Sequence, residues 1–342
     1  MGRRSLYVYG FPALYGGANT ELQHQIHLWL RMGVQVHVIP TDPGYLTEPL
    51  YDELRGTRAI IHAPNNFRVI ERDAPVIGFC CDAFLSNIDL IREHSANTVW
   101  VNCMSHLWSL EKRRAAEGKI GTFLYQNPDV RDAHAAVLRD LNRTSTPRFL
   151  VFTSYLDAER FPLMEDHSTE HFGCGRISRA VPEKYARHIL HIYEYFVAPK
   201  PKQGLFLGFD DQCAAKIGKP PSWIRTARNH LSCSQRALYE HCEIILQPTD
   251  TIENWPRVGL EAMSSGSVLI VDNRGGWRRQ VRHGVTGWLC GTPQDFIYYA
   301  SKMAYEPQLR LDMARQARQH LEALAGEDLA RESWDQVFRE IM

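Results

Sequence analysis

The chain has 342 residues, enough for two domains of ordinary size, and its 44% hydrophobic and 23% charged residues are typical of a globular protein. The 39 basic and 39 acidic residues cancel, so the composition gives no strong general attraction to nucleic acid or to an anionic membrane. No apolar run approaches the roughly 20 residues that a membrane helix needs, and eight cysteines without a Cys-x-x-Cys pair indicate reduced, buried thiols of a cytoplasmic protein.

The chain opens with a strand, a glycine-rich loop, a helix and a second strand. These are predicted at residues 6–9, 10–17, 18–32 and 34–39, respectively. In such a β-loop-α-β unit the loop, which ends in Gly16 and Gly17, lies at the ligand-binding edge of a parallel sheet. The two glycines either allow a ligand to approach the backbone or serve only the turn. The dinucleotide fingerprint Gly-x-Gly-x-x-Gly is absent.

Polar residues follow the next two predicted strands. Strands are predicted at residues 59–62, 76–79 and 98–101, and a helix at 105–116. Asn66 follows the first of these strands and Asp82 follows the second. Asp82 has two interpretations that the sequence leaves open: it accepts a hydrogen bond from a bound hydroxyl group, or it caps the next helix. His24 and His27 lack an evident third ligand, so no metal site is predicted.

The second half continues the alternation of strands and helices. Strands are predicted at residues 148–152, 204–208, 244–246 and 268–271, helices at 186–197, 236–242, 256–265, 294–303, 307–324 and 334–341, and a hairpin at 285–289. The acidic pair Asp210-Asp211 is interpreted as part of a loop.

Two carboxylates flank a helix N-terminus in residues 247–276. Glu253 lies in the polar loop after one strand, Glu261 lies in the helix, and Gly275-Gly276 follow the next strand. A helix N-terminus offers N–H groups and partial positive charge that suit phosphate, whereas ionised carboxylates accept hydrogen bonds from sugar or ribose hydroxyls. Because open α/β sheets bind ligands at this edge, the stretch predicts a nucleotide-sugar site.

The spacing of Glu253 and Glu261 in this strand-helix-strand-Gly-Gly frame resembles a known family signature. It is the Glu-x7-Glu motif of retaining GT-B glycosyltransferases, especially the family 4 group (glycosyl transferases group 1). The resemblance implies two Rossmann-like, doubly wound α/β domains that face a cleft. Residues 1–160 would form the acceptor domain, with a C-terminal helix at about 328–342 packed back on it. Residues 161–327 would form the nucleotide-sugar donor domain.

The resemblance also assigns roles to individual residues. The segment that opens the second half resembles one in which an arginine and a lysine grip the donor diphosphate, and Arg176 and Lys184 match them. Arg179 could substitute for either, and Tyr185 stands where the family has glycine. Catalytic roles fall to Glu253, Arg176 and Lys184. The donor-binding residues implied are Gly16, Gly17, Glu253, Asn254, Trp255, Pro256, Arg257 and Glu261.

Two departures from the family keep a non-catalytic function open. Cys81 stands where many relatives have a histidine that contacts the transferred sugar, and Arg279 stands where most have a glutamate. One alternative is therefore a non-catalytic nucleotide-sugar-binding protein. Another is a two-carboxylate glycoside hydrolase with Glu253 and Glu261 as acid and base, which the phosphate-binding cations disfavour.

The activity implied by the resemblance is transfer of a sugar from a nucleotide-diphosphate sugar to an acceptor hydroxyl, with retention of the anomeric configuration. No metal cofactor is expected, because the cations and the helix terminus stabilise the leaving diphosphate. Asp82 and Asn66 are the candidates for contact with the acceptor. The sequence does not identify the sugar, the base, the acceptor or the oligomeric state.

Overall fold

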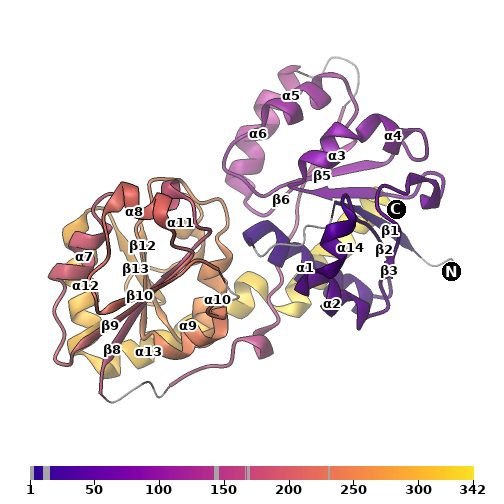
Figure 1. Ribbon diagram of the computed structural model, residues 1–342. Coiled ribbons are helices and arrows are strands. Elements are labelled where there is room, and N and C mark those ends of the chain that lie inside the picture. The colour runs from indigo at the N-terminus through magenta and orange to yellow at the C-terminus, as the bar shows by residue number, and fades with distance from the viewer. Residues whose placement is uncertain (1–3, 11–15, 142–145, 166, 168–169, 230–231) are drawn as a thin grey trace. The chain divides into compact units, whose positions relative to one another are not determined.

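The structure is a computed structural model that describes residues 4–10, 16–141, 146–165, 167, 170–229 and 232–342 (Figure 1). Residues 11–15 of the predicted glycine-rich loop lie outside this description. The chain divides into two compact units, one formed by Met1–Tyr155 with Ala325–Met342 and the other by Leu156–Leu324. The first unit is therefore assembled from two separate parts of the sequence.

The first unit contains a parallel sheet that is buried on both faces. In the described residues its strand order is β3-β2-β1-β4-β5-β6-β7. Leu6 and Val8 belong to one hydrophobic core, whereas Tyr7 and Tyr9 belong to another, because successive residues of a strand point to opposite faces. The strands are β1 (Ser5–Tyr9), β2 (Gln35–Ile39), β3 (Ile60–Ile61), β4 (Val76–Phe79), β5 (Thr98–Asn102), β6 (Thr122–Tyr125) and β7 (Arg148–Val151).

Helices cover both faces of this sheet (Figure 1). Residues of α1 (Gly17–Arg31), α2 (Pro49–Arg55) and α14 (Glu327–Ile341) join the core around Leu6, and residues of α3 (Asp82–Ser86), α4 (Ile88–Arg92), α5 (Ser109–Ala116) and α6 (Pro128–Leu141) join the core around Tyr7. The described residues also form short 3₁₀ helices: η1 (Pro43–Thr47) and η2 (Phe67–Val69) in the first unit, and η3 (Ala158–Arg160) and η4 (Pro182–Lys184) in the second. In α14 the ring of the fully buried Trp334 lies 4.7 Å from that of Trp29 and 5.3 Å from that of Phe152, measured between centroids. The C-terminal helix is thus part of the core of the first unit.

The second unit contains another parallel sheet, with strand order β10-β9-β8-β11-β12-β13 in the described residues. Its strands are β8 (Phe172–Ile177), β9 (Lys202–Leu207), β10 (Ile224–Ala227), β11 (Ile244–Gln247), β12 (Val268–Asp272) and β13 (Gly287–Cys290). The hairpin predicted at 285–289 is wrong, because β13 pairs in parallel with β12, with Leu269 opposite Gly287. A tight turn, in which Gly284 N donates to Gly287 O at 2.9 Å, precedes this edge strand instead.

One face of the second sheet shares a hydrophobic core with α7 (Ile189–Tyr195), α8 (Asp211–Ile217), α12 (Pro293–Tyr305) and α13 (Pro307–Ala325). The remaining helices are α9 (Gln235–His241), α10 (Arg257–Ser265) and α11 (Trp277–Gln280). The Asp210-Asp211 pair is not a loop: Asp210 caps α8 by accepting from Cys213 N at 3.0 Å, and Asp211 is the first helical residue. Two doubly wound α/β units are thus confirmed.

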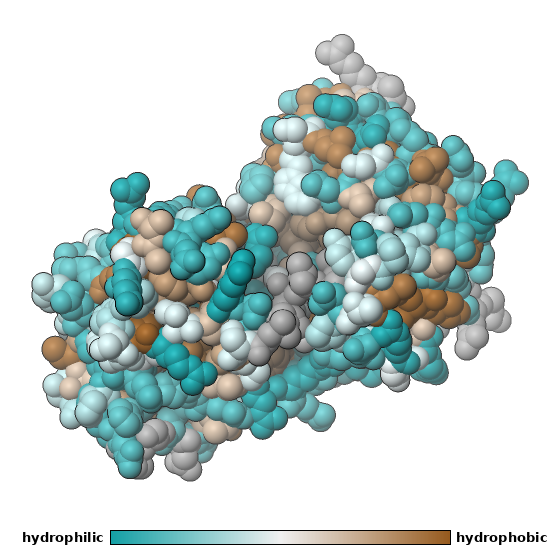
Figure 2. All heavy atoms as spheres, viewed as in Figure 1, coloured by the Kyte–Doolittle hydropathy of each residue, from teal (hydrophilic) through white to brown (hydrophobic). Residues whose placement is uncertain are grey.

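None of the described helices is both long enough and apolar enough to cross a membrane. The face of the molecule shown in Figure 2 is mostly hydrophilic, and its hydrophobic side chains form small separate areas.

We expect Trp334→Ala to lower the free energy of unfolding of the first unit by about 3–5 kcal/mol, because it leaves a cavity in a closely packed aromatic core. Leu329 lies on the same helix and is 39% exposed, so Leu329→Ala is the matched control. It should lower the free energy of unfolding by only about 0.5 kcal/mol. Urea unfolding followed by circular dichroism measures both. Equal effects would contradict the role of α14 in this core.

Candidate functional site

The second sheet changes direction between β8 and β11. From β8 the chain moves through β9 to β10 at one side, and from β11 it moves through β12 to β13 at the other. The loops that follow β8 and β11 therefore leave the same edge side by side, at the point where open α/β sheets bind ligands. We call residues 178–185 the β8 loop and residues 248–256 the β11 loop.

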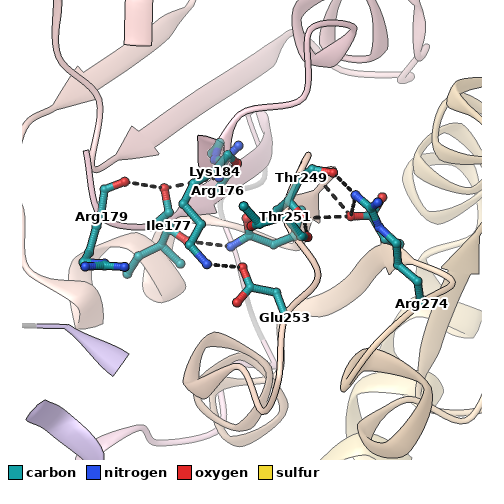
Figure 3. A network of polar contacts seen from close by, with 11 residues as sticks. Arg176, Ile177, Arg179, Lys184, Thr249, Thr251, Glu253 and Arg274 are labelled. Carbon is teal, nitrogen blue, oxygen red and sulfur yellow. Dashed lines mark hydrogen bonds and ion pairs between the residues drawn. The ribbon is translucent and has the colours of Figure 1, made fainter. Parts of the chain in front are cut away.

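Lys184 of the β8 loop and Glu253 of the β11 loop form an ion pair at this switch point. Lys184 Nζ lies 2.6 Å from Glu253 Oε1 (Figure 3). The two side chains are 20% and 19% exposed, so the pair is less screened than one on the open surface but remains accessible to solvent. The structure thus brings together two predicted site residues that are 69 positions apart in the sequence.

Gly275 and Gly276 hold the end of the β11 loop in place. Gly276 N donates to Glu253 O at 2.8 Å. A Cβ atom on Gly276 would lie 1.9 Å from Asn254 O, and one on Gly275 would lie 2.5 Å from Glu253 O. Gly275 has φ +55°, but Gly276 has φ −63°, which any residue can adopt. Position 276 therefore needs glycine only because two backbones approach each other closely there.

Contacts with the end of β12 hold the start of the β11 loop. Thr249 donates from its backbone N and from Oγ1 to Asp272 Oδ2, at 2.9 and 3.0 Å. Arg274 lies 3.5 Å from the same oxygen and donates to Thr249 O (Figure 3). Burial raises the pKa of Asp272, and the hydrogen bonds from Thr249 and the charge of Arg274 oppose that rise. None of these three was among the sequence-predicted site residues, although Asp272 ends a buried strand.

Arg176 is placed differently from the expected open phosphate grip. It is 0% exposed, and its Nη2 donates to Lys184 O at 2.7 Å and to Ser178 Oγ at 3.2 Å. Its guanidinium carbon lies 3.7 Å from the centre of the Tyr185 ring. Within the described residues its Nε and Nη1 have no hydrogen-bond partner. Arg176 thus contacts the Lys184 backbone, and its contact with phosphate stays a prediction, whereas Arg179 is exposed.

Glu261 is also buried. It lies within α10 and is only 2% exposed. Its Oε2 accepts from Tyr239 Oη at 3.0 Å and from Gln235 Nε2 at 3.4 Å. Of the two predicted carboxylates, Glu253 is the one that pairs with the β8 loop.

The remaining predicted donor residues of this unit surround the start of α10. Asn254 is buried and Trp255 is half-buried, Pro256 is the N-cap residue, and Arg257 is the first residue of the helix and is buried. The N-cap residue Pro256 makes no side-chain hydrogen bond to this N-terminus. Its first N–H groups and its partial positive charge suit an anion.

Gly16, Gly17, Asn66 and Asp82 belong to the first unit. Gly16 is the N-cap residue of α1, Gly17 is its first residue, and Asn66 follows β3. Asp82 is exposed and is the first residue of α3, whose N-cap is Cys81. The interpretation of Asp82 as the helix cap is therefore wrong, and its contact with an acceptor stays a prediction.

A hydrogen-bonded group of Tyr9, Asn65 and Asn87 lies at the same sheet edge and was not predicted. Tyr9 Oη donates to Asn65 Oδ1 at 2.7 Å and accepts from Asn87 Nδ2 at 2.9 Å. Burial raises the pKa of Tyr9 to about 12, so the hydroxyl stays protonated at neutral pH. These residues are far apart in sequence, which left no local signal. In the described part of the chain, no three His, Cys, Asp or Glu side chains are grouped to hold a metal ion.

We expect Gly276→Ala to displace the β11 loop and to lower the free energy of unfolding of the second unit by about 1–3 kcal/mol, because the new methyl group has no space. Gly291→Ala is the matched control, since its Cβ would lie 3.6 Å from the nearest atom, Asp295 Oδ2. Urea unfolding measures both variants. If the two are equally stable, the close approach at position 276 does not constrain the loop.

Comparisons with known proteins bear on this site. Residues 233–320 match the family model described as Glycosyl transferases group 1, a segment that includes Glu253, Glu261 and both glycines at 275–276. YtcC of Bacillus subtilis (strain 168), a protein assigned to the glycosyltransferases, is 38% identical over 71 residues. That match spans 20% of this chain and 17% of the length of YtcC.

The whole chain is similar to several solved structures. HepE of Anabaena, solved with UDP and glucose, has 14% identity and a TM-score of 0.75, with 99% of this chain and 100% of that chain covered. TarM of S. aureus has 10% identity and a TM-score of 0.80 over 98% and 99% of the two chains. The pneumococcal O-GlcNAc transferase GtfA, solved with UDP and GlcNAc, has 11% identity and a TM-score of 0.70 over 100% and 99%. The protein therefore has the GT-B fold, and its residues 233–320 match the group 1 glycosyltransferases.

Proposed function

We propose that the protein transfers a sugar from a nucleotide-diphosphate sugar to a hydroxyl group of an acceptor. The observation that carries this proposal is the pairing of Lys184 with Glu253, 2.6 Å apart at the sheet switch point. An ammonium group suits a pyrophosphate, and a carboxylate suits sugar hydroxyls. The family match over residues 233–320 supports the same donor class, as do the UDP, glucose and GlcNAc bound to similar structures.

In the proposed complex, the donor diphosphate replaces Glu253 as the partner of Lys184. Phosphate oxygens make strong charge-assisted hydrogen bonds with an ammonium group, and the released Glu253 then accepts from hydroxyls of the transferred sugar. The N-terminus of α10, with the backbone amides of Asn254, Trp255 and Arg257, adds further donors. Glu261 would serve the ribose. Lys184 stabilises the charge that develops on the leaving diphosphate. Arg176 donates a hydrogen bond to the backbone carbonyl of Lys184.

We further propose that the anomeric configuration is retained, as in the family 4 enzymes that the sequence resembles. The leaving phosphate can accept the acceptor's proton on the same face of the sugar, so the protein supplies no nucleophile.

In this scheme Lys184 and the α10 N-terminus neutralise the diphosphate without a divalent metal. Initial rates in EDTA and in MgCl₂ should then agree within about twofold, and a loss of activity in EDTA that Mg²⁺ restores would contradict this part.

The hydrolase alternative requires two carboxylates on either side of a glycosidic bond. Glu253 is partly exposed and could serve as one of the two. Glu261 is only 2% exposed, and its Oε2 already accepts hydrogen bonds from Tyr239 and Gln235. The burial of Glu261 therefore disfavours hydrolysis by an acid and base pair.

Two substitutions test the proposed function. We expect Lys184→Met to weaken binding of UDP by tenfold or more, about 1.4 kcal/mol, because the cation that meets the pyrophosphate is lost. We expect Glu253→Gln to bind UDP within about threefold of wild type. With acceptor present, it should consume UDP-glucose or UDP-GlcNAc about 100-fold more slowly, which corresponds to an activation barrier about 2.7 kcal/mol higher. Lys219→Met, at an exposed lysine of the same unit, is the matched control.

Calorimetry for binding and chromatography of the released UDP for turnover give both readouts. Wild type that binds none of UDP, GDP and ADP would refute the proposed function. If wild type and Glu253→Gln bind UDP but are equally inert toward every donor, the protein is a nucleotide-sugar-binding protein.

A further inference from the structure

Tyr185 follows Lys184 directly and is completely buried. Its hydroxyl donates to Gly208 O at 2.6 Å, and burial raises the pKa of Tyr185 to about 12, so this donor keeps its proton at neutral pH. In the enzymes that the sequence resembles, a glycine follows the lysine. This chain thus has an anchored side chain where those enzymes have a flexible residue.

The Tyr185 hydroxyl ties the end of the β8 loop to the end of β9. The start of the same loop meets the same turn, because a Cβ atom on Gly208 would lie 1.7 Å from Ser178 O. Gly208 has φ +91°, and its N–H donates to Ala227 O of β10 at 2.8 Å. Both ends of the β8 loop are therefore held by one fixed turn at Gly208.

The ring of Tyr185 has a second contact, with Arg176. The guanidinium carbon lies 3.7 Å from the ring centre, and such a buried cation is stabilised by the face of an aromatic ring. Arg176 Nη2 in turn donates to Lys184 O at 2.7 Å, and Lys184 N donates to Val181 O at 3.1 Å. The backbone on both sides of the Lys184 side chain is thus fixed, partly through Tyr185.

We propose that Tyr185 is a positioning residue that holds the Lys184 ammonium at the place where it meets the donor pyrophosphate. This inference rests on the proposed function, and it concerns how the phosphate contact is pre-organised. A side chain whose backbone is already ordered loses less entropy on binding. Loss of the Tyr185 hydroxyl should therefore weaken binding of a ligand with a pyrophosphate and spare a ligand without one.

The test compares UDP with uridine on the full chain. We expect Tyr185→Phe to raise the Kd for UDP about five- to tenfold, as the loss of one buried hydrogen bond allows, and to change the Kd for uridine less than about twofold. Tyr185→Met, which also removes the ring face beneath Arg176, should weaken UDP at least as much.

Tyr193→Phe is the matched control. Tyr193 is as buried as Tyr185 and lies in the same hydrophobic core, and within the described residues its hydroxyl has no hydrogen-bond partner. Its Kd for UDP should stay within about twofold of wild type. UDP binding by Tyr185→Phe equal to wild type, or an equal loss of UDP and uridine binding, overturns the positioning role while leaving the proposed function intact. Failure of wild type to bind UDP, GDP or ADP overturns both.

Discussion

The candidate site depends on the close approach of the β11 loop to Gly275 and Gly276. The backbone oxygens of Glu253 and Asn254 occupy the space that any Cβ atom at those two positions would need. Because the start of the same loop is hydrogen-bonded to Asp272, the end of β12 fixes the loop at two places. The Glu253 carboxylate therefore emerges from a rigid support and meets Lys184, which is held by a separate set of contacts around Gly208.

The sequence predicted this site well where local rules apply. Buried β-branched strands that end in polar or glycine residues mark the carboxyl edge of a parallel sheet, which is why Glu253 could be expected at that edge. Lys184 was assigned only through the family resemblance, because β8 was not predicted as a strand. Side-chain direction follows no such rule. Arg176 lies near the end of β8, and its guanidinium folds against Tyr185 and the Lys184 carbonyl. That orientation results from packing between strands, which the order of residues does not reveal.

Several short elements were missed, and so was the 14-residue helix α6. The strand β6 has only four residues, and the apolar pattern of β8 is interrupted by two glycines and an arginine. The helix α8 was missed because the Asp210-Asp211 pair suits a loop as well as a helix start, and only the bond from Cys213 N to Asp210 decides between them. The strand β4 has the predicted bounds 76–79.

The placement of α14 has a consequence for the order in which the molecule can be completed. Residues 156–324 of the second unit are continuous, so all its strands and helices are available before α14 is synthesised. The first unit lacks Trp334 and Phe338 until residues 156–324 have been added. During synthesis, one apolar face of the first sheet therefore lacks the helix α14 until the whole second unit has been made.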